Sequence, residues 1–273
     1  MTPSLLFIGG GNMATAIIGG LVRSGTAPAS IGVVEPVAAQ RETLQRTLGV
    51  IVWDSVAEAG DVLGGVTRVV WAVKPQSFTE AAAPAAGRLA GALHLSVMAG
   101  IRSDALVRAT GSERVVRAMP NTPALIGMGI SGLYARPAVD GSDRAGVEAL
   151  LAPTGTVLWV DQESDLDAVT ALSGSGPAYV FFFVEAMMAA AQRMGLSEAQ
   201  GKTLALATFA GATELARRSD EPPSVLRERV TSKGGTTHAA LTAMGEAGMA
   251  PAFIAALEAA QRRARELGDA FGA

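Results

Sequence analysis

From Leu5 to Val160, short apolar runs alternate with stretches whose apolar residues recur at helical spacing. The runs that predict strands are Leu5–Ile8, Ile31–Val34, Val50–Val52, Val66–Val73, Leu93–Val97 and Val115–Met119, and the runs expected to extend the same sheet are Ile130–Tyr134 and Val157–Val160. Nearly continuous Val, Ile and Leu strands that alternate with helices are typical of a parallel sheet covered on both faces. The first part of the chain is therefore predicted to be a doubly wound α/β domain.

After Asp161 the pattern changes to alanine-rich helical periodicity without a convincing strand. The predicted helices are Leu166–Ser173, Pro177–Met194, Ser197–Arg218, Ser224–Val230, Thr237–Glu246 and Ala250–Leu267. The change predicts an α/β domain over residues 1–161 and an all-α domain over 162–273. Because these helices are apolar on so many faces, we expect a homodimer or a higher homo-oligomer to cover them.

The most apolar stretch runs from Ala178 to Met194 and includes three consecutive phenylalanines. Its length approaches that of a membrane-spanning helix, which needs about 20 apolar residues with few charges. Glu185 interrupts the stretch, however, and its flanks are polar. This pattern favours a buried interdomain or dimer helix over a membrane span.

Composition excludes several classes of function. The 273 residues are 49% hydrophobic and 17% charged, which is ample material for folded cores. A net charge of -3, with no basic run interleaved with aromatics, argues against a nucleic acid partner. The chain has no cysteine and only two distant histidines, so we expect no disulfide and no metal site. The first residues lead directly into a strand rather than a signal peptide, which favours a cytoplasmic location.

A glycine turn joins the first predicted strand to a helix. Gly9 permits the tight turn, Gly11 lets the backbone approach a pyrophosphate, and Ala14 is the small residue where the helix packs on the sheet. Backbone N–H groups at the start of the helix, at Asn12 and Met13, then face the phosphates. This arrangement predicts a Rossmann-type dinucleotide site.

Glu35 ends the second predicted strand, where an acidic side chain would bind the adenosine ribose and favour NADH. Arg41 or Arg23 would instead favour the 2'-phosphate of NADPH. The sequence therefore predicts NADPH or NADH without choosing between them.

Other cofactor contacts are expected where later strands end, because the carboxyl ends of parallel strands meet at one edge of the sheet. Lys74 follows one strand as a polar contact, and the turn at Asn121 follows another near the nicotinamide position. The complete predicted cofactor set is Gly9, Gly11, Asn12, Met13, Ala14, Glu35, Ser55, Ala72, Val73, Lys74, Pro75, Ala99 and Asn121.

A second glycine-containing loop lies in the helical part, where Gly234 and Gly235 are flanked by hydroxyl side chains and precede a helix. Exposed backbone N–H groups at a helix start bind carboxylates and other anions. Together with the dinucleotide turn, this loop indicates a dehydrogenase with separate cofactor and substrate elements. The alternative is that its hydroxyls only cap the helix.

Five motifs, in order, resemble pyrroline-5-carboxylate reductase over nearly the whole chain. They are the glycine turn at Gly9, the segment 73–76, the asparagine turn at Asn121, the segment 173–177 and the segment 234–237. The resemblance implies NAD(P)H-dependent reduction of a cyclic imine to proline, with the substrate held near a dimer interface. It also implies a substrate site of Ser232, Gly234, Gly235, Thr236 and Thr237, in which Thr237 hydrogen-bonds the ring nitrogen and is the catalytic residue.

Two departures from the family pattern affect affinity more than reaction type. Lys233 stands where the family commonly has proline, which adds a positive charge or mobility to the substrate loop. The segment 53–55 replaces a threonine-aspartate-asparagine pattern, so Ser55 offers the adenosine less than an asparagine would.

Two other functions compete with this interpretation. A 3-hydroxyacid dehydrogenase has the same layout but needs a lysine on the central helix, and none lies between Ser173 and Met194. A non-catalytic dinucleotide sensor would share the fold, but it would not require the intact loop at 232–237. His94 and His238 are interpreted as structural or surface residues.

Overall fold

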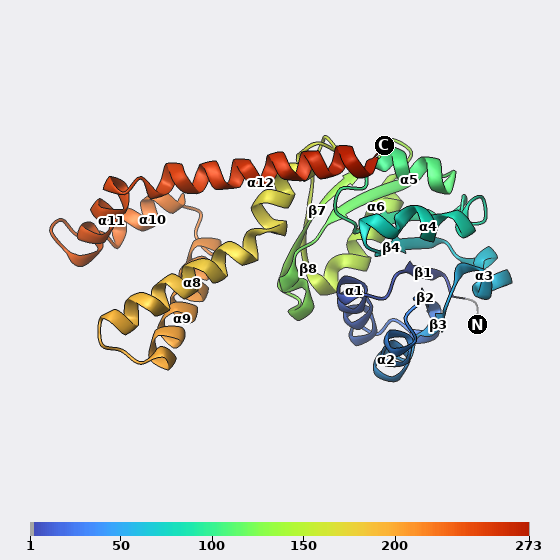
Figure 1. The fold of residues 1–273 in the computed structure, drawn as a ribbon, viewed down its shortest axis with the longest axis horizontal. Helices are drawn as coiled ribbons and strands as arrows, with labels where there is room; N and C mark the ends of the chain where they lie inside the picture. Colours follow the sequence, from blue (N-terminus) through green and yellow to red (C-terminus); the bar gives the residue numbers. More distant parts are fainter. Residues whose placement is uncertain (1–2, 273) are drawn as a thin grey trace. The chain divides into compact units, whose positions relative to one another are not determined.

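The computed structural model describes residues 3–272. Within them, eight strands form one sheet in the order β3-β2-β1-β4-β5-β6-β7-β8 (Figure 1). The strands are β1 (Leu5–Ile8), β2 (Ile31–Val34), β3 (Ile51–Trp53), β4 (Arg68–Trp71), β5 (Leu93–Ser96), β6 (Val115–Met119), β7 (Gly129–Ala135) and β8 (Gly155–Trp159). All the predicted strands are present, which confirms the α/β prediction.

Helices cover both faces of this sheet. They are α1 (Asn12–Arg23), α2 (Ala38–Leu48), α3 (Val56–Ala59), α4 (Phe78–Ala82), α5 (Ser103–Thr110) and α6 (Gly141–Leu151). Alternate residues of a strand face opposite sides of a sheet. Accordingly, Phe7 of β1 packs in a core with α1, α2 and α6, whereas Leu6 packs in a second core with α3, α4 and α5.

The sheet is not parallel throughout, because β7 runs antiparallel to β6. A parallel return requires a crossover of a dozen or more residues. Only a short connection containing the 3-10 turn Thr122–Ile126 separates these two strands. The prediction of a parallel sheet was therefore wrong at this one pair.

Strand β1 lies between β2 and β4, so the chain builds the sheet outward in one direction and then restarts on the other side of β1. In open α/β sheets, ligands bind outside the carboxyl ends of the strands at such a switch point. Gly9 and Glu35 directly follow the two strands β1 and β2. The topology thus places the predicted cofactor residues at one edge.

Two polar clusters are built into this part of the chain. His94 of β5 is fully buried, and its Nδ1 accepts a hydrogen bond from Trp71 Nε1 at 3.0 Å while its Nε2 lies 3.0 Å from the Leu89 carbonyl oxygen. Arg117 of β6 is buried and donates to Glu163 at 2.8 Å. Burial raises the pKa of Glu163, but hydrogen bonds from Ser103 and the charge of Arg117 outweigh it, so the pKa is lowered overall.

The remaining elements are helical. They are α7 (Asp165–Val169), a π-helical turn (Thr170–Gly174), α8 (Gly176–Arg193), α9 (Glu198–Arg217), α10 (Pro223–Arg229), α11 (Thr236–Glu246) and α12 (Met249–Gly272). Ser197 caps α9 through a capping box with Gln200, and Gly195 ends the preceding turn with a positive φ of 89°. Serine before the first turn and glycine after the last turn are residues typical of helix caps.

The chain folds as two compact units. The first comprises residues 1–175 and 260–273, and the second comprises Gly176–Ala259. The last helix, α12, belongs to both, because its final part packs in the first unit, where the ring of Phe271 lies beside Gly100 and Arg102 pairs with Asp269. The compact units thus divide at residue 175, whereas the boundary predicted from sequence periodicity lies at residue 161.

The second unit exposes large apolar side chains. Phe181 and Phe182 of α8 are 60% and 65% exposed, and Leu204 and Leu215 of α9 are also exposed. By length and composition alone, the stretch Asp165–Arg193 is sufficiently apolar to cross a membrane, and the bent pair α11 and α12 passes the same test together. The single chain does not bury these side chains, so this unit has an exposed apolar surface of the kind that marks an interaction site.

Candidate active site

The glycine turn after β1 is fixed by close backbone contacts. Gly9 has a φ of 99°, and a Cβ at this position would lie 2.7 Å from the Ala72 carbonyl oxygen. Gly11 has no neighbour within 4 Å of its ideal Cβ position, so its outer side is open. The tight turn therefore requires glycine at residue 9, whereas at residue 11 glycine leaves room for a ligand.

The start of α1 is equipped to bind an anion. Gly11 is its N-cap residue, no side chain caps it, and the first turn contains no acidic residue. The first N–H groups of the helix, including those of Asn12 and Met13, therefore lack an intrahelical acceptor. Ala14 is fully buried against the sheet. These features fit the pyrophosphate of a dinucleotide.

Glu35 braces the glycine turn from the end of β2. Its side chain is buried, with Oε2 accepting from the Gly10 N–H at 2.9 Å and Oε1 accepting from the Val37 N–H at 2.9 Å. The Gln40 amide donates to the Gly10 carbonyl oxygen at 2.5 Å. A carboxylate has about four acceptor positions, so about two remain for a ribose hydroxyl. The sequence predicted the ribose role but not this structural one.

Of the two arginines predicted as alternatives for a 2'-phosphate, Arg41 lies near the end of β2. Its Nη1 donates to the carbonyl oxygens of Glu35 and Pro36, both at 2.8 Å. Arg23 is the last residue of the 12-residue helix α1. At 1.5 Å per residue, it lies roughly 16 Å along the axis from the phosphate end of that helix. The structure therefore retains Arg41 and removes Arg23 from this edge.

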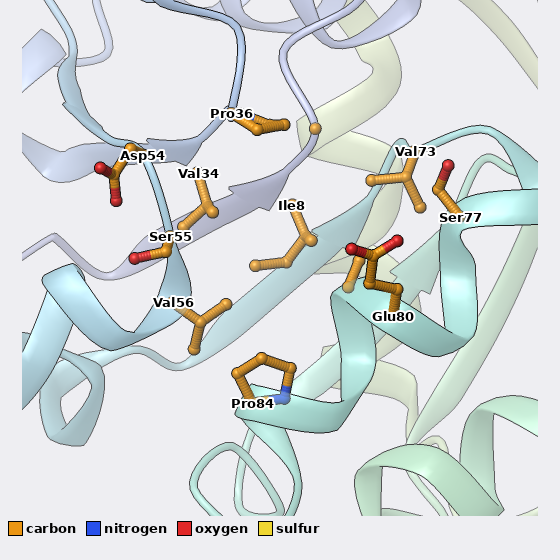
Figure 2. A pocket seen from close by; sticks show the side chains of 12 residues that line it. Ile8, Val34, Pro36, Asp54, Ser55, Val56, Val73, Ser77, Glu80 and Pro84 are labelled. Atoms are coloured by element: carbon orange, nitrogen blue, oxygen red, sulfur yellow. The ribbon is translucent and has the colours of Figure 1, made fainter.

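A pocket of about 280 Å³ opens where β1, β2, β3 and β4 end, and we call it the strand-end pocket (Figure 2). Its lining residues are Ile8, Gly9, Val34, Pro36, Asp54, Ser55, Val56, Val73, Ser77, Glu80, Ala81 and Pro84. Most of the surface is apolar, as a flat adenine base requires. The predicted residues Gly9, Ser55 and Val73 belong to it.

The sequence missed several residues of this pocket, among them Pro36, Val56 and Glu80. For Pro36 and Val56 the available signal was their position, since each follows by two or three residues a strand that ends at the switch-point edge. Glu80 lies on α4 and carries no such local signal. Ser55 has a second role, since its hydroxyl caps α3 by accepting from the Glu58 N–H at 3.2 Å.

Other predicted cofactor residues follow β4, β5 and β6. Ala72 donates its N–H to the Ile8 carbonyl oxygen at 2.8 Å. Lys74 and Pro75 lead into a 3-10 turn, and Lys74 is exposed. Ala99 is exposed in the segment after β5. All of these residues lie in the first compact unit.

Asn121 fixes the turn after β6 rather than extending freely. Its Oδ1 accepts from the Ile130 N–H at 3.0 Å, which ties the end of β6 to β7. The neighbouring Met119 packs on Gly174, where a Cβ would lie 2.5 Å from the methionine Cε. Gly174 ends the π-helical turn, a rare element that is frequent at functional sites. The sequence identified both segments but not the contact between them.

The predicted substrate loop lies by itself in the second compact unit. Gly234 has a φ of 75°, and Gly235 is the N-cap residue of α11, with its N–H bonded to the Ser232 carbonyl oxygen at 3.0 Å. No side chain caps this helix, and its first turn has no acidic residue. Ser232 and Thr236 are exposed, and Thr237 is half-buried. The loop therefore presents uncapped N–H groups and hydroxyls to a ligand, as in an anion site.

Within the described part of the chain, no group of three or more His, Asp or Glu side chains is arranged to hold a metal ion. The glycine turn, the strand-end pocket and the α11 loop are the candidate ligand-binding features of this site.

Comparison with known proteins gives one family match for the helical part of the chain and another for the α/β part. Residues 163–267 match the family described as pyrroline-5-carboxylate reductase dimerisation, and residues 4–100 match the family described as NADP oxidoreductase, coenzyme F420-dependent. The chain is 42% identical to the pyrroline-5-carboxylate reductase of Pseudomonas aeruginosa, over 99% of both proteins. The chain belongs to the pyrroline-5-carboxylate reductase family.

Further members of this family support the assignment. The reductase of a Synechocystis species is 38% identical over 98% of this chain and 99% of its own length. A solved reductase structure from Coxiella burnetii superposes with a TM-score of 0.88 at 34% identity, covering 98% of this chain and 99% of its own. The Plasmodium falciparum enzyme, solved with NADP bound, has a TM-score of 0.85 at 28% identity, covering 97% and 98%. The family resemblance inferred from five motifs is confirmed.

Proposed function

We propose that this protein reduces 1-pyrroline-5-carboxylate to proline with NAD(P)H. The observation that carries the proposal is the 42% identity to a pyrroline-5-carboxylate reductase over 99% of both chains. The first compact unit supplies a dinucleotide site, and the second supplies an uncapped helix start with a half-buried threonine. This function accounts for both.

The residues present fit a dinucleotide. The N–H groups of Asn12 and Met13 would hold the pyrophosphate, because α1 has no side-chain cap and Gly11 is open above it. The strand-end pocket would hold the adenosine, and the segment around Asn121 and Gly174 would border the nicotinamide. When bound, NAD(P)H supplies the hydride that reduces the carbon of the imine.

The α11 loop would bind the substrate. Backbone N–H groups after Gly235, with the hydroxyls of Ser232 and Thr236, would hold the carboxylate. The Thr237 hydroxyl would hydrogen-bond the ring nitrogen and fix the ring relative to the hydride donor. The imine nitrogen is basic enough to carry its own proton, so the product amine forms without a strong acid from the protein.

We further propose that the protein works as a homodimer in the cytoplasm and binds neither membranes nor nucleic acids. The dimerisation match at residues 163–267 covers the exposed phenylalanines of α8, and a second copy would bury them. Size-exclusion chromatography with light scattering should give twice the chain mass or an even multiple of it. A monomer would contradict the proposal. We also keep the domain boundary after residue 161 as a proposal, which the family match beginning at residue 163 supports.

The deciding experiment is a spectrophotometric assay with purified protein. NADH and NADPH are supplied in parallel, with and without pyrroline-5-carboxylate, and proline is measured as the product. We expect oxidation that depends on the imine and proline in equal amounts. Dinucleotide binding without oxidation would overturn the enzymatic proposal and favour a sensor.

A further inference from the structure

The strand-end pocket has an unusual charge distribution. Among its twelve lining residues, the charged side chains are Asp54 and Glu80, and none is lysine or arginine. Figure 2 shows Glu80 extending from α4 toward Val73 on one side of the pocket, with Asp54 and Ser55 on the opposite side. The charged residues on the two sides of this pocket are therefore both acidic.

The surroundings add a third negative charge. Glu35 follows the lining residue Val34, and its buried carboxylate accepts two backbone N–H groups. Two positive residues lie close in sequence to the lining residues but are not part of the lining. Arg41 donates to the carbonyl oxygens of Glu35 and Pro36, and Lys74 is an exposed residue beside the pocket.

We propose that this pocket selects against a phosphate on the adenosine ribose, with Glu80 and Asp54 as the discriminating residues, so that the protein prefers NADH to NADPH. The inference rests on the proposed function, because it assigns the strand-end pocket to the adenosine. A ribose hydroxyl can donate a hydrogen bond to a carboxylate, whereas a 2'-phosphate has only acceptor oxygens and repels it.

The expected size of the effect follows from simple electrostatics. A phosphate monoester carries a charge of about -1.5 to -2 at neutral pH. The pocket is small enough that both carboxylates lie within about one Debye length of such a group, where salt screens only part of the repulsion. Together they should weaken NADPH binding about tenfold relative to NADH at low salt, and added salt should reduce this difference.

Isothermal titration calorimetry without substrate tests the inference separately from catalysis. NADH, NADPH, AMP and adenosine 2',5'-bisphosphate are titrated at low and high salt into the wild-type protein and the variants Glu80→Gln, Asp54→Asn and the double variant. Glu42→Gln is the matched control, since Glu42 is an exposed carboxylate on α2 outside the pocket lining. Thermal unfolding verifies that each variant is folded.

We expect the wild-type protein to bind NADH about tenfold more tightly than NADPH. The double variant should lose most of this difference, chiefly by gaining affinity for NADPH, and Glu42→Gln should keep it. Equal or tighter binding of NADPH by the wild-type protein would overturn the inference, as would a preference for NADH that survives in the double variant. If no dinucleotide binds at all, the proposed function fails together with the inference, which distinguishes that result from a failure of selectivity alone.

Discussion

The glycine turn at Gly9 and the glycine loop at Gly234 both lead into helix starts without side-chain caps, yet they differ in how they are held. Around Gly9, the backbone of Ala72 is in close contact and the buried carboxylate of Glu35 fixes the neighbouring N–H. Around Gly234, Ser232 and Thr236 are exposed, Thr237 is only half-buried, and the helix has no buried residue. Internal packing thus fixes the conformation of the dinucleotide turn. The conformation of the substrate loop instead depends on contacts with a ligand or a second copy of the chain.

The sharpest test of the packed turn compares two glycines. Gly9→Ala should have the largest effect on stability, because its Cβ would meet the Ala72 backbone and its φ is positive. We expect a loss of about 3 kcal/mol or more in the free energy of unfolding. Gly11→Ala should unfold like the wild-type protein but bind dinucleotide more weakly. Urea denaturation and calorimetry distinguish the two. Equal stability of both variants would contradict the proposed packing.

The two histidines extend the comparison to pH, since His94 is buried in the first unit and His238 is exposed in the second. Burial lowers the pKa of His94 from 6.5 to about 4. Between pH 6.5 and about pH 4, His94 is therefore protonated in the unfolded chain but neutral in the folded chain. Stability should fall over this interval, by about 3 kcal/mol at pH 4 from this group alone. An NMR titration giving His94 a pKa near 6.5 would contradict this.

On the exposed loop, Thr237→Ala should lower the turnover number about 100-fold, because the ring nitrogen loses the group that orients it. Dinucleotide affinity should not change. Thr242→Ala is the matched control, since Thr242 lies on the same helix with its hydroxyl bonded to the His238 carbonyl oxygen. Steady-state kinetics and dinucleotide titration measure the two effects. Wild-type turnover in Thr237→Ala would remove this residue from the mechanism.

A smaller effect is expected for Glu35→Gln, which keeps the shape of the brace but replaces one carboxylate oxygen with an amide donor. The variant can accept only one of the two backbone N–H bonds, so the turn loosens. NADH should bind about tenfold more weakly, and NADPH should lose less affinity, because the variant also removes one of the negative charges near the pocket. Calorimetry with each dinucleotide tests this. If only the affinity for NADH fell, Glu35 would act mainly by binding the ribose rather than by fixing the turn.

The sequence predicted strands well where buried apolar runs made them recognisable, from β1 to β6. It could not predict that β7 runs antiparallel to β6, because an apolar run has the same composition in either direction. The turn at Gly9 was predictable from local spacing alone. The bond between Gly10 and Glu35 was not, since it joins residues 25 positions apart and depends on side-chain rotamers. Glu80 was missed for the same reason, because only the folded sheet brings α4 beside the end of β3.

The course of α12 affects how the protein is made. The last part of α12 belongs to the first compact unit, although it is synthesised after the whole of the second unit. Phe271 packs on Gly100 and Asp269 pairs with Arg102. A nascent chain whose eight strands have all been synthesised therefore still lacks these contacts until α12 follows. The first unit therefore completes its fold only after the whole second unit has been synthesised. Until then, the part of the second core on which Phe271 packs is left uncovered.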